Sequence, residues 1–163
     1  MARNSNGTGT APQERLMPLP QRPFTCITGE LLRILVADDH EAVRTGVCTI
    51  LQSRGDVEIC GQAANGREAV QKAGELNPDL VLLDITMPVL DGLSAAREIR
   101  NLVPRVVILF LSMHEGEHMA NLAKSSGASG YVSKSAGSDT LLKAVDIVTA
   151  HGTFFPIESE KRE

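Results

Sequence analysis

The chain has 163 residues, of which 42% are hydrophobic, 22% charged and 3% aromatic. This length and apolar share suit one compact domain with tails, and they exclude a chain that is disordered throughout. The net charge of −4 argues against a dedicated nucleic-acid-binding protein. Apolar runs stay well short of the about 20 residues that cross a bilayer, so no membrane contact is expected. The three cysteines lack the spacing of a zinc site or a disulfide framework, which favours a cytoplasmic location.

The two ends of the chain differ from its middle. Residues 1–31 are rich in proline and small polar residues and lack apolar periodicity, so they predict a disordered N-terminal leader. Residues 32–156 carry the regular pattern and predict a single domain. Residues 157–163 predict a charged tail or the start of a linker.

Five short apolar runs predict the strands of a parallel sheet; they cover residues 34–37, 57–60, 80–83, 106–111 and 130–132. Runs of this length, rich in Val, Ile and Leu, are typical of strands that are buried on both faces. The segments between and after them have helical spacing: the second opens at Asn65 with Glu68 as a capping box, the third at Asp91, and the fourth covers residues 115–126. Five alternating strands and helices predict a three-layer α/β sandwich.

Polar side chains directly follow four of the five runs: Asp38, Asp39 and His40 after the first, Asp84 after the third, Ser112 after the fourth and Lys134 after the fifth. In a doubly wound parallel sheet the functional crevice lies at the carboxyl ends of the strands. The second run ends in two alanines, which indicates a strand at the margin of the sheet.

Three carboxylates at one edge repel each other unless a cation or a raised pKa relieves the repulsion. Oxygen ligands without a Cys or His cluster favour a hard ion, and Mg²⁺ is the natural candidate. A carboxylate can act as the nucleophile toward phosphorus, while Mg²⁺, Lys134 and the Ser112 hydroxyl stabilise the phosphoryl oxygens. The pattern therefore predicts phosphoryl transfer to an aspartate.

Four motifs resemble the receiver domain of bacterial two-component response regulators: Asp38-Asp39, LLDITMPVLDG (82–92), LFLSMHE (109–115) and GYVSKSA (130–136). Each is weak alone, but the four in order at the strand ends are specific. The resemblance covers nearly all of the regular region. It implies a flavodoxin-like (βα)5 fold, with a doubly wound sheet in the strand order 2-1-3-4-5.

The resemblance also implies residue roles. Asp84 would be the phosphoacceptor, and Mg²⁺ would be bound by Asp39, Asp84 and the main-chain carbonyl of Thr86, with Asp38 acting through water. No metal role is expected for His40.

Three further residues receive roles from the same resemblance. Ser112 and Lys134 would hold the phosphoryl oxygens, and Tyr131 would be the switch aromatic. Ser135 departs from the family pattern, because many receivers have proline after the lysine. That departure leaves the conformation of the Lys134–Ser135 bond open.

The segment VADDHEAVRTG and the Ser-Met-His after the fourth run are most similar to the NarL/FixJ subfamily, whose members usually carry a C-terminal helix-turn-helix. The residues that follow Phe155 are too few for such a domain, so this segment is expected to make no direct contact with nucleic acid. If a helix-turn-helix domain is missing from this sequence, the output is transcription regulation. If none exists, the alternative is a stand-alone receiver that acts through protein contacts.

The resemblance implies a signalling phosphoprotein rather than an enzyme. A sensor histidine kinase would donate the phosphoryl group, and the phosphorylated protein would switch an output surface or form a homodimer. A haloacid-dehalogenase-type phosphatase is an alternative, but it needs Asp-x-Asp and Thr86 stands at the place of the second acid. A flavin carrier of the same fold is a further alternative, which would need a Ser/Thr-rich loop where Asp38 and Asp39 stand.

Overall fold

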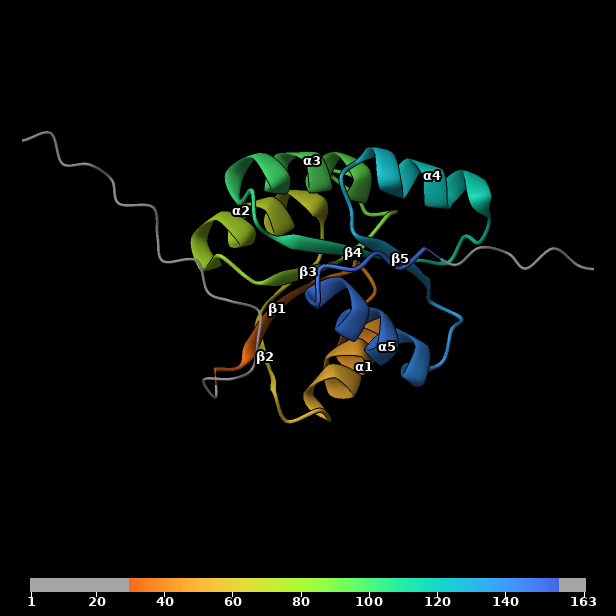
Figure 1. Cartoon of the computed structure of the whole chain (residues 1–163). Helices are drawn as coiled ribbons and strands as arrows, with labels where there is room; N and C mark the ends of the chain where they lie inside the picture. Colours follow the sequence, from red (N-terminus) through yellow and green to blue (C-terminus); the bar gives the residue numbers. More distant parts are fainter. Residues whose placement is uncertain (1–29, 156–163) are drawn as a thin grey trace, which may run out of the picture.

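The computed structural model describes residues 30–155 (Figure 1). All but the last two residues of the predicted leader, and the whole of the predicted charged tail, lie outside the described residues. Within residues 30–155, no helix is both long enough and apolar enough to cross a membrane.

Five strands alternate with five helices, as the sequence predicts. In chain order they are β1 (Leu32–Ala37), α1 (Glu41–Gln52), β2 (Val57–Ala63), α2 (Gly66–Leu76), β3 (Leu80–Asp84), α3 (Gly92–Leu102), β4 (Val107–Ser112), α4 (Glu117–Ser125), β5 (Gly130–Ser133) and α5 (Ser138–Thr149).

The strands form one parallel sheet in the order β2-β1-β3-β4-β5. Helices α1 and α5 cover one face, and α2, α3 and α4 cover the other, so the molecule has three layers (Figure 1). The flavodoxin-like fold, its strand order and the marginal position of the second strand are therefore confirmed.

The sheet separates two apolar cores because alternate side chains of each strand point to opposite faces. Leu35, Val81 and Leu83 pack toward α2, α3 and α4, whereas Val36 and Leu82 pack toward α1 and α5. Both faces are buried, which explains why β1, β3 and β4 read as continuous apolar runs rather than as alternating ones.

Two helix starts match the sequence signals. The side chain of Asn65 accepts a hydrogen bond from the Glu68 amide at 2.8 Å, and the Asp91 carboxylate accepts one from the Ser94 amide at 2.9 Å. The returning contact of the predicted capping box is displaced by one residue, because the Glu68 carboxylate accepts from the amide of Ala64.

The fourth helix is shorter than predicted and begins at Glu117 rather than at residue 115. Gly116 precedes it with φ 128°, a backbone angle that leaves the helical region. Glu115 therefore stays in the loop after β4. The second strand is longer than predicted and reaches Ala63, because its pairing with β1 continues to Ala37.

After α5, the chain returns to the free edge of β5. The amide of Phe154 donates to the carbonyl of Ser129 at 3.0 Å, and the amide of Tyr131 donates to the carbonyl of Phe154 at 2.8 Å. This parallel bridge places residues 153–155 beside β5. The edge strand is thus covered by the protein's own chain.

Candidate functional site

The predicted site residues meet at the carboxyl ends of the strands. Asp38 and Asp39 follow β1, Asp84 is the last residue of β3, Ser112 is the last residue of β4, and Lys134 follows β5. Because β1, β3, β4 and β5 are neighbours in this parallel sheet, residues far apart in sequence lie at one edge (Figure 1).

Lys134 pairs with two buried carboxylates at once. Its Nζ lies 2.7 Å from Asp38 Oδ2 and 3.0 Å from Asp84 Oδ2, and all three side chains are almost wholly buried. Burial alone would lower the pKa of Lys134, but the two carboxylates raise it above its ordinary value. The amine therefore stays charged at the centre of the site.

Burial and the neighbouring charge of Asp38 raise the pKa of the Asp84 carboxyl, while Lys134 and the Thr86 amide oppose the shift. The Thr86 amide donates to Asp84 Oδ1 at 3.3 Å, so the loop after β3 curls back over the carboxylate. This contact places the main chain of Thr86 beside Asp84. A metal-ligating role for the Thr86 carbonyl stays a prediction.

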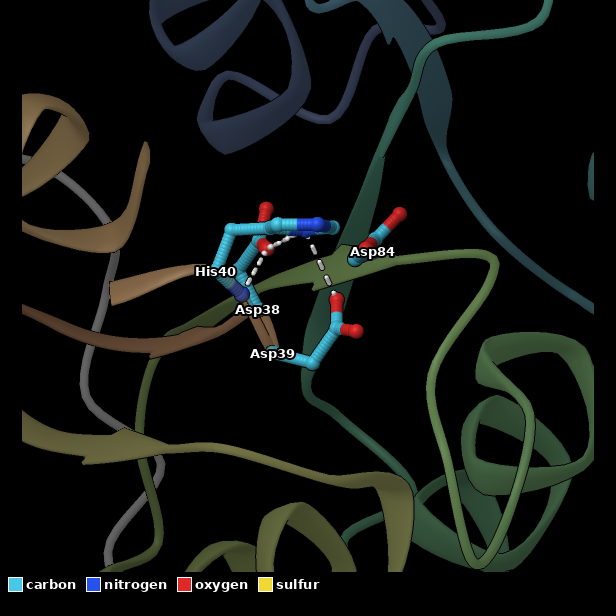
Figure 2. A group of neighbouring side chains, drawn as sticks. All are labelled: Asp38, Asp39, His40 and Asp84. Atoms are coloured by element: carbon cyan, nitrogen blue, oxygen red, sulfur yellow. Dashed lines mark hydrogen bonds and ion pairs between the residues drawn. The ribbon is translucent and has the colours of Figure 1, made fainter. Parts of the chain in front are cut away.

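Four side chains could hold a metal ion together: Asp38, Asp39, His40 and Asp84 each offer one ligand atom, and these atoms lie within 4.8 Å of one another (Figure 2). Three carboxylates and one ammonium group leave two negative charges, which a divalent cation would neutralise. The oxygen donors therefore fit Mg²⁺. Sequence reasoning left His40 out of this group.

Ser112 and Tyr131 lie on the adjacent strands β4 and β5 and are both buried. Ser112 Oγ accepts a hydrogen bond from the amide of His114 at 3.0 Å. Burial raises the pKa of the Tyr131 phenol, and the nearby Ser112 hydroxyl opposes that shift, although the phenol oxygen has no hydrogen-bond partner of standard geometry. The ring of Tyr131 packs within the core cluster that faces α4.

Residues 34–146 match the family model of the response regulator receiver domain. The chain belongs to the response regulator receiver family. It is 38% identical over 128 residues to the transcriptional regulatory protein LnrK of Bacillus subtilis, covering 78% of this chain and 58% of LnrK. It is 36% identical over 120 residues to the response regulator GacA of Pseudomonas viridiflava, covering 74% of this chain and 56% of GacA. The chain thus spans little more than half the length of these curated relatives.

Solved structures agree with this membership. A LuxR-family two-component response regulator from Aurantimonas sp. SI85-9A1 superimposes with a TM-score of 0.74 at 34% identity, covering 77% of this chain and 89% of that one. The signal receiver domain of NarL from Mycobacterium tuberculosis superimposes with a TM-score of 0.71 at 31% identity, covering 74% of this chain and 98% of that domain. The resemblance to the NarL/FixJ subfamily is therefore confirmed.

In the loop after β5, this receiver has Ser135 where many receivers have proline after the lysine. The Lys134–Ser135 bond is trans, like every other peptide bond of the described residues. Glu115, from the loop after β4, accepts hydrogen bonds from Ser133 Oγ at 2.7 Å and from Ser135 Oγ at 2.6 Å. No local sequence signal could have shown this bridge, because its two sides are about twenty residues apart.

Proposed function

We propose that Asp84 of this receiver accepts a phosphoryl group from a sensor histidine kinase in the presence of Mg²⁺. The observation that carries the proposal is the pairing of one lysine with two buried carboxylates. Lys134 contacts both Asp38 and Asp84, and Asp39 lies within the same group of ligand atoms. This set combines a nucleophile, a positive charge and a place for a divalent ion.

In the proposed reaction, a carboxylate oxygen of Asp84 forms a bond to phosphorus as the phosphorus–nitrogen bond of a phosphohistidine breaks. The departing imidazole takes up a proton from solvent. Lys134, which already touches Asp84, would pair with the phosphoryl oxygens, and the buried Ser112 hydroxyl would donate a hydrogen bond to one of them.

The divalent ion belongs to the same proposal. Asp39 and Asp84 would hold it directly, with the main-chain carbonyl of Thr86 and with Asp38 through water. Bound Mg²⁺ neutralises negative charge on the transferring phosphoryl group. The protein's own contribution is to hold the three carboxylates and Lys134 in place, so that little rearrangement is needed.

We further propose that Ser112 and Tyr131 pass the phosphorylation state to the face formed by α4, β5 and α5. The Ser112 hydroxyl would turn toward the phosphate, and Tyr131 would move into the space that it leaves. Because Tyr131 is already buried, the switch would exchange two buried packings rather than bring an exposed ring inside.

For the whole protein we propose a signalling role in the cytoplasm rather than an enzymatic one. Transcription regulation is the favoured output, since LnrK is named a transcriptional regulatory protein and the chain matches only part of its length. The free thiols of Cys48 and Cys60 suit a reducing compartment. We also propose that the phosphorylated protein forms a homodimer. This segment itself would make no direct contact with nucleic acid.

The phosphoacceptor is tested with acetyl phosphate and Mg²⁺ followed by intact-protein mass spectrometry. The parent protein should gain one phosphate, and Asp84→Asn should gain none. Asp139→Asn, which changes an exposed carboxylate in the first turn of α5, should be labelled like the parent. Labelling of Asp84→Asn at the parental level would refute the assignment.

A further inference from the structure

The imidazole of His40 belongs to the acidic group at the strand ends. His40 Nδ1 lies 3.1 Å from Asp39 Oδ1 and 3.5 Å from Asp38 Oδ1. Figure 2 shows the ring beside both carboxylates, with a ring nitrogen turned toward them and Asp84 on the far side of the group. One ring nitrogen of His40 is among the four ligand atoms that lie within 4.8 Å of one another.

A backbone hydrogen bond places His40 next to Asp38. His40 occupies the position before α1, and its amide donates to Asp38 Oδ1 at 2.9 Å. Its side chain makes no capping hydrogen bond to the helix, so the imidazole has no structural task at the helix start. The His40 side chain is 69% exposed, whereas that of Asp38 is almost wholly buried. An ion arriving from solvent would therefore meet the imidazole and the carboxylates together.

We infer that His40 is a nitrogen ligand of the receiver's metal site, and that it makes the site bind borderline divalent ions such as Co²⁺ or Zn²⁺ more tightly, relative to Mg²⁺, than oxygen ligands alone would. The inference rests on the proposed function, because it concerns the same metal site. It differs from the sequence-based expectation, which gave His40 no metal role.

The chemistry of the ligands determines which ions bind more tightly when His40 takes part. Imidazole nitrogen suits Zn²⁺, Co²⁺, Ni²⁺ and Cu²⁺, whereas Mg²⁺ prefers oxygen ligands and retains several waters. The ring nitrogen that binds the ion must offer a free lone pair. Mg²⁺ would leave the imidazole aside and use the carboxylates.

The geometry needs only a small adjustment. Ligand atoms about 2.1 Å from one ion are at most about 4.2 Å apart, so a 4.8 Å group has to contract by several tenths of an ångström. The exposed His40 and part-exposed Asp39 side chains can rotate, which would shorten the distances that involve them. Asp38 and Asp84, which Lys134 holds, can keep their positions.

The test measures Co²⁺ and Mg²⁺ binding to the full chain by calorimetric titration, with the visible absorption of bound Co²⁺ as a report on its ligands. His40→Gln should weaken Co²⁺ binding roughly tenfold, the lower end of what loss of even an outer-shell partner costs a metal site, and leave Mg²⁺ affinity unchanged. The Co²⁺ spectrum should change as the nitrogen ligand is lost. His40→Asn is a second variant that keeps a good helix-capping side chain.

Two control variants separate this site from other metal binding. His114→Gln removes a histidine that the ligand group does not include, and it should bind both ions like the parent. Asp39→Ala removes a carboxylate of the group, and it should weaken the binding of both Co²⁺ and Mg²⁺.

Unchanged Co²⁺ binding by His40→Gln would overturn the inference while leaving the phosphoacceptor proposal intact. An equal loss of Co²⁺ and Mg²⁺ affinity in His40→Gln would also overturn the inference, because His40 would then only orient Asp39. Failure of the parent to bind Mg²⁺, or parental binding of both ions by Asp39→Ala, would instead refute the proposed metal site itself. The failure of the proposed function is thereby distinguished from that of the inference.

Discussion

The main chain around Asp84 leaves no space for a side chain at Gly92. The Gly92 amide donates to the Ile85 carbonyl at 2.7 Å, which pulls the start of α3 against the end of β3. A Cβ atom at this position would lie 2.0 Å from the carbonyl oxygen of Asp84. A methyl group added at Gly92 would therefore collide with the backbone of Asp84, the proposed phosphoacceptor.

Gly92→Ala should destabilise the protein by about 1–3 kcal/mol, because the backbone of β3 or α3 has to move. Gly46→Ala is the matched control, since Gly46 is exposed inside α1 and a Cβ there meets nothing within 4 Å. That control should stabilise the fold by about 0.5–1 kcal/mol through helix propensity. Urea unfolding measures both. A Gly92→Ala protein that is as stable as the parent, or more stable, would contradict the close approach at Gly92.

At the scale of elements, the segment after α5 completes the edge of the sheet. Phe154 bonds to both neighbours of Gly130, and Phe155 packs against the core cluster that contains Tyr131, with Lys124 Nζ 4.9 Å from the centre of its ring. Gly130 itself needs a bare backbone, because a Cβ would lie 2.8 Å from the Phe154 carbonyl oxygen. The amide of the proposed switch residue is thus held by the C-terminal end of the described chain.

Phe155→Ala should lower the free energy of unfolding by about 1–2 kcal/mol, less than the ~3–5 kcal/mol for a fully buried Phe, because Phe155 is only partly buried. Amide exchange at Tyr131 should become faster, since the acceptor of that amide is the carbonyl of Phe154. Leu102→Ala, at a residue that is 58% exposed, should change stability by less than about 0.5 kcal/mol. Unchanged Tyr131 exchange in Phe155→Ala would show that Phe155 does not hold the segment in place.

At the scale of the whole molecule, the site and the proposed output face share strands. Asp84 ends the central strand, while Ser112 and Tyr131 lie on the two strands next to it toward the α4–α5 side. Packed cores change between discrete arrangements rather than deform smoothly. In the proposed switch, a phosphoryl group on Asp84 would therefore alter the packing at α4, β5 and α5 without a large movement.

Beryllofluoride, which mimics the phosphate on Asp84, should change amide exchange between residues 112 and 148 in the parent protein. The reason is that, in the proposed switch, the two packings of Ser112 and Tyr131 would differ in affinity for the phosphate. Ser112→Ala should remain phosphorylatable at Asp84 but show a smaller change. Identical protection of residues 112–148 with and without the mimic would refute the switch, even with Asp84 correctly assigned.

Much of the candidate site could be predicted because its residues directly follow apolar runs. Once the runs form a parallel sheet, their carboxyl ends are neighbours, and Asp84 and Lys134 meet although fifty residues separate them. The place of the His40 ring beside Asp38 and Asp39 could not be predicted, because adjacency in sequence does not show which way a ring turns. Glu115 was missed because its contacts with Ser133 and Ser135 join two separate loops.

The sequence by itself determined the order of strands and helices and the identity of the polar residues at the strand ends, because apolar periodicity and capping residues act over a few positions. Only the tertiary structure decided the pairing of Lys134 with both Asp38 and Asp84 and the return of Phe154 to the edge of β5. These features depend on which side chains and backbone groups the packed sheet brings within a few ångströms, and no local pattern encodes that distance.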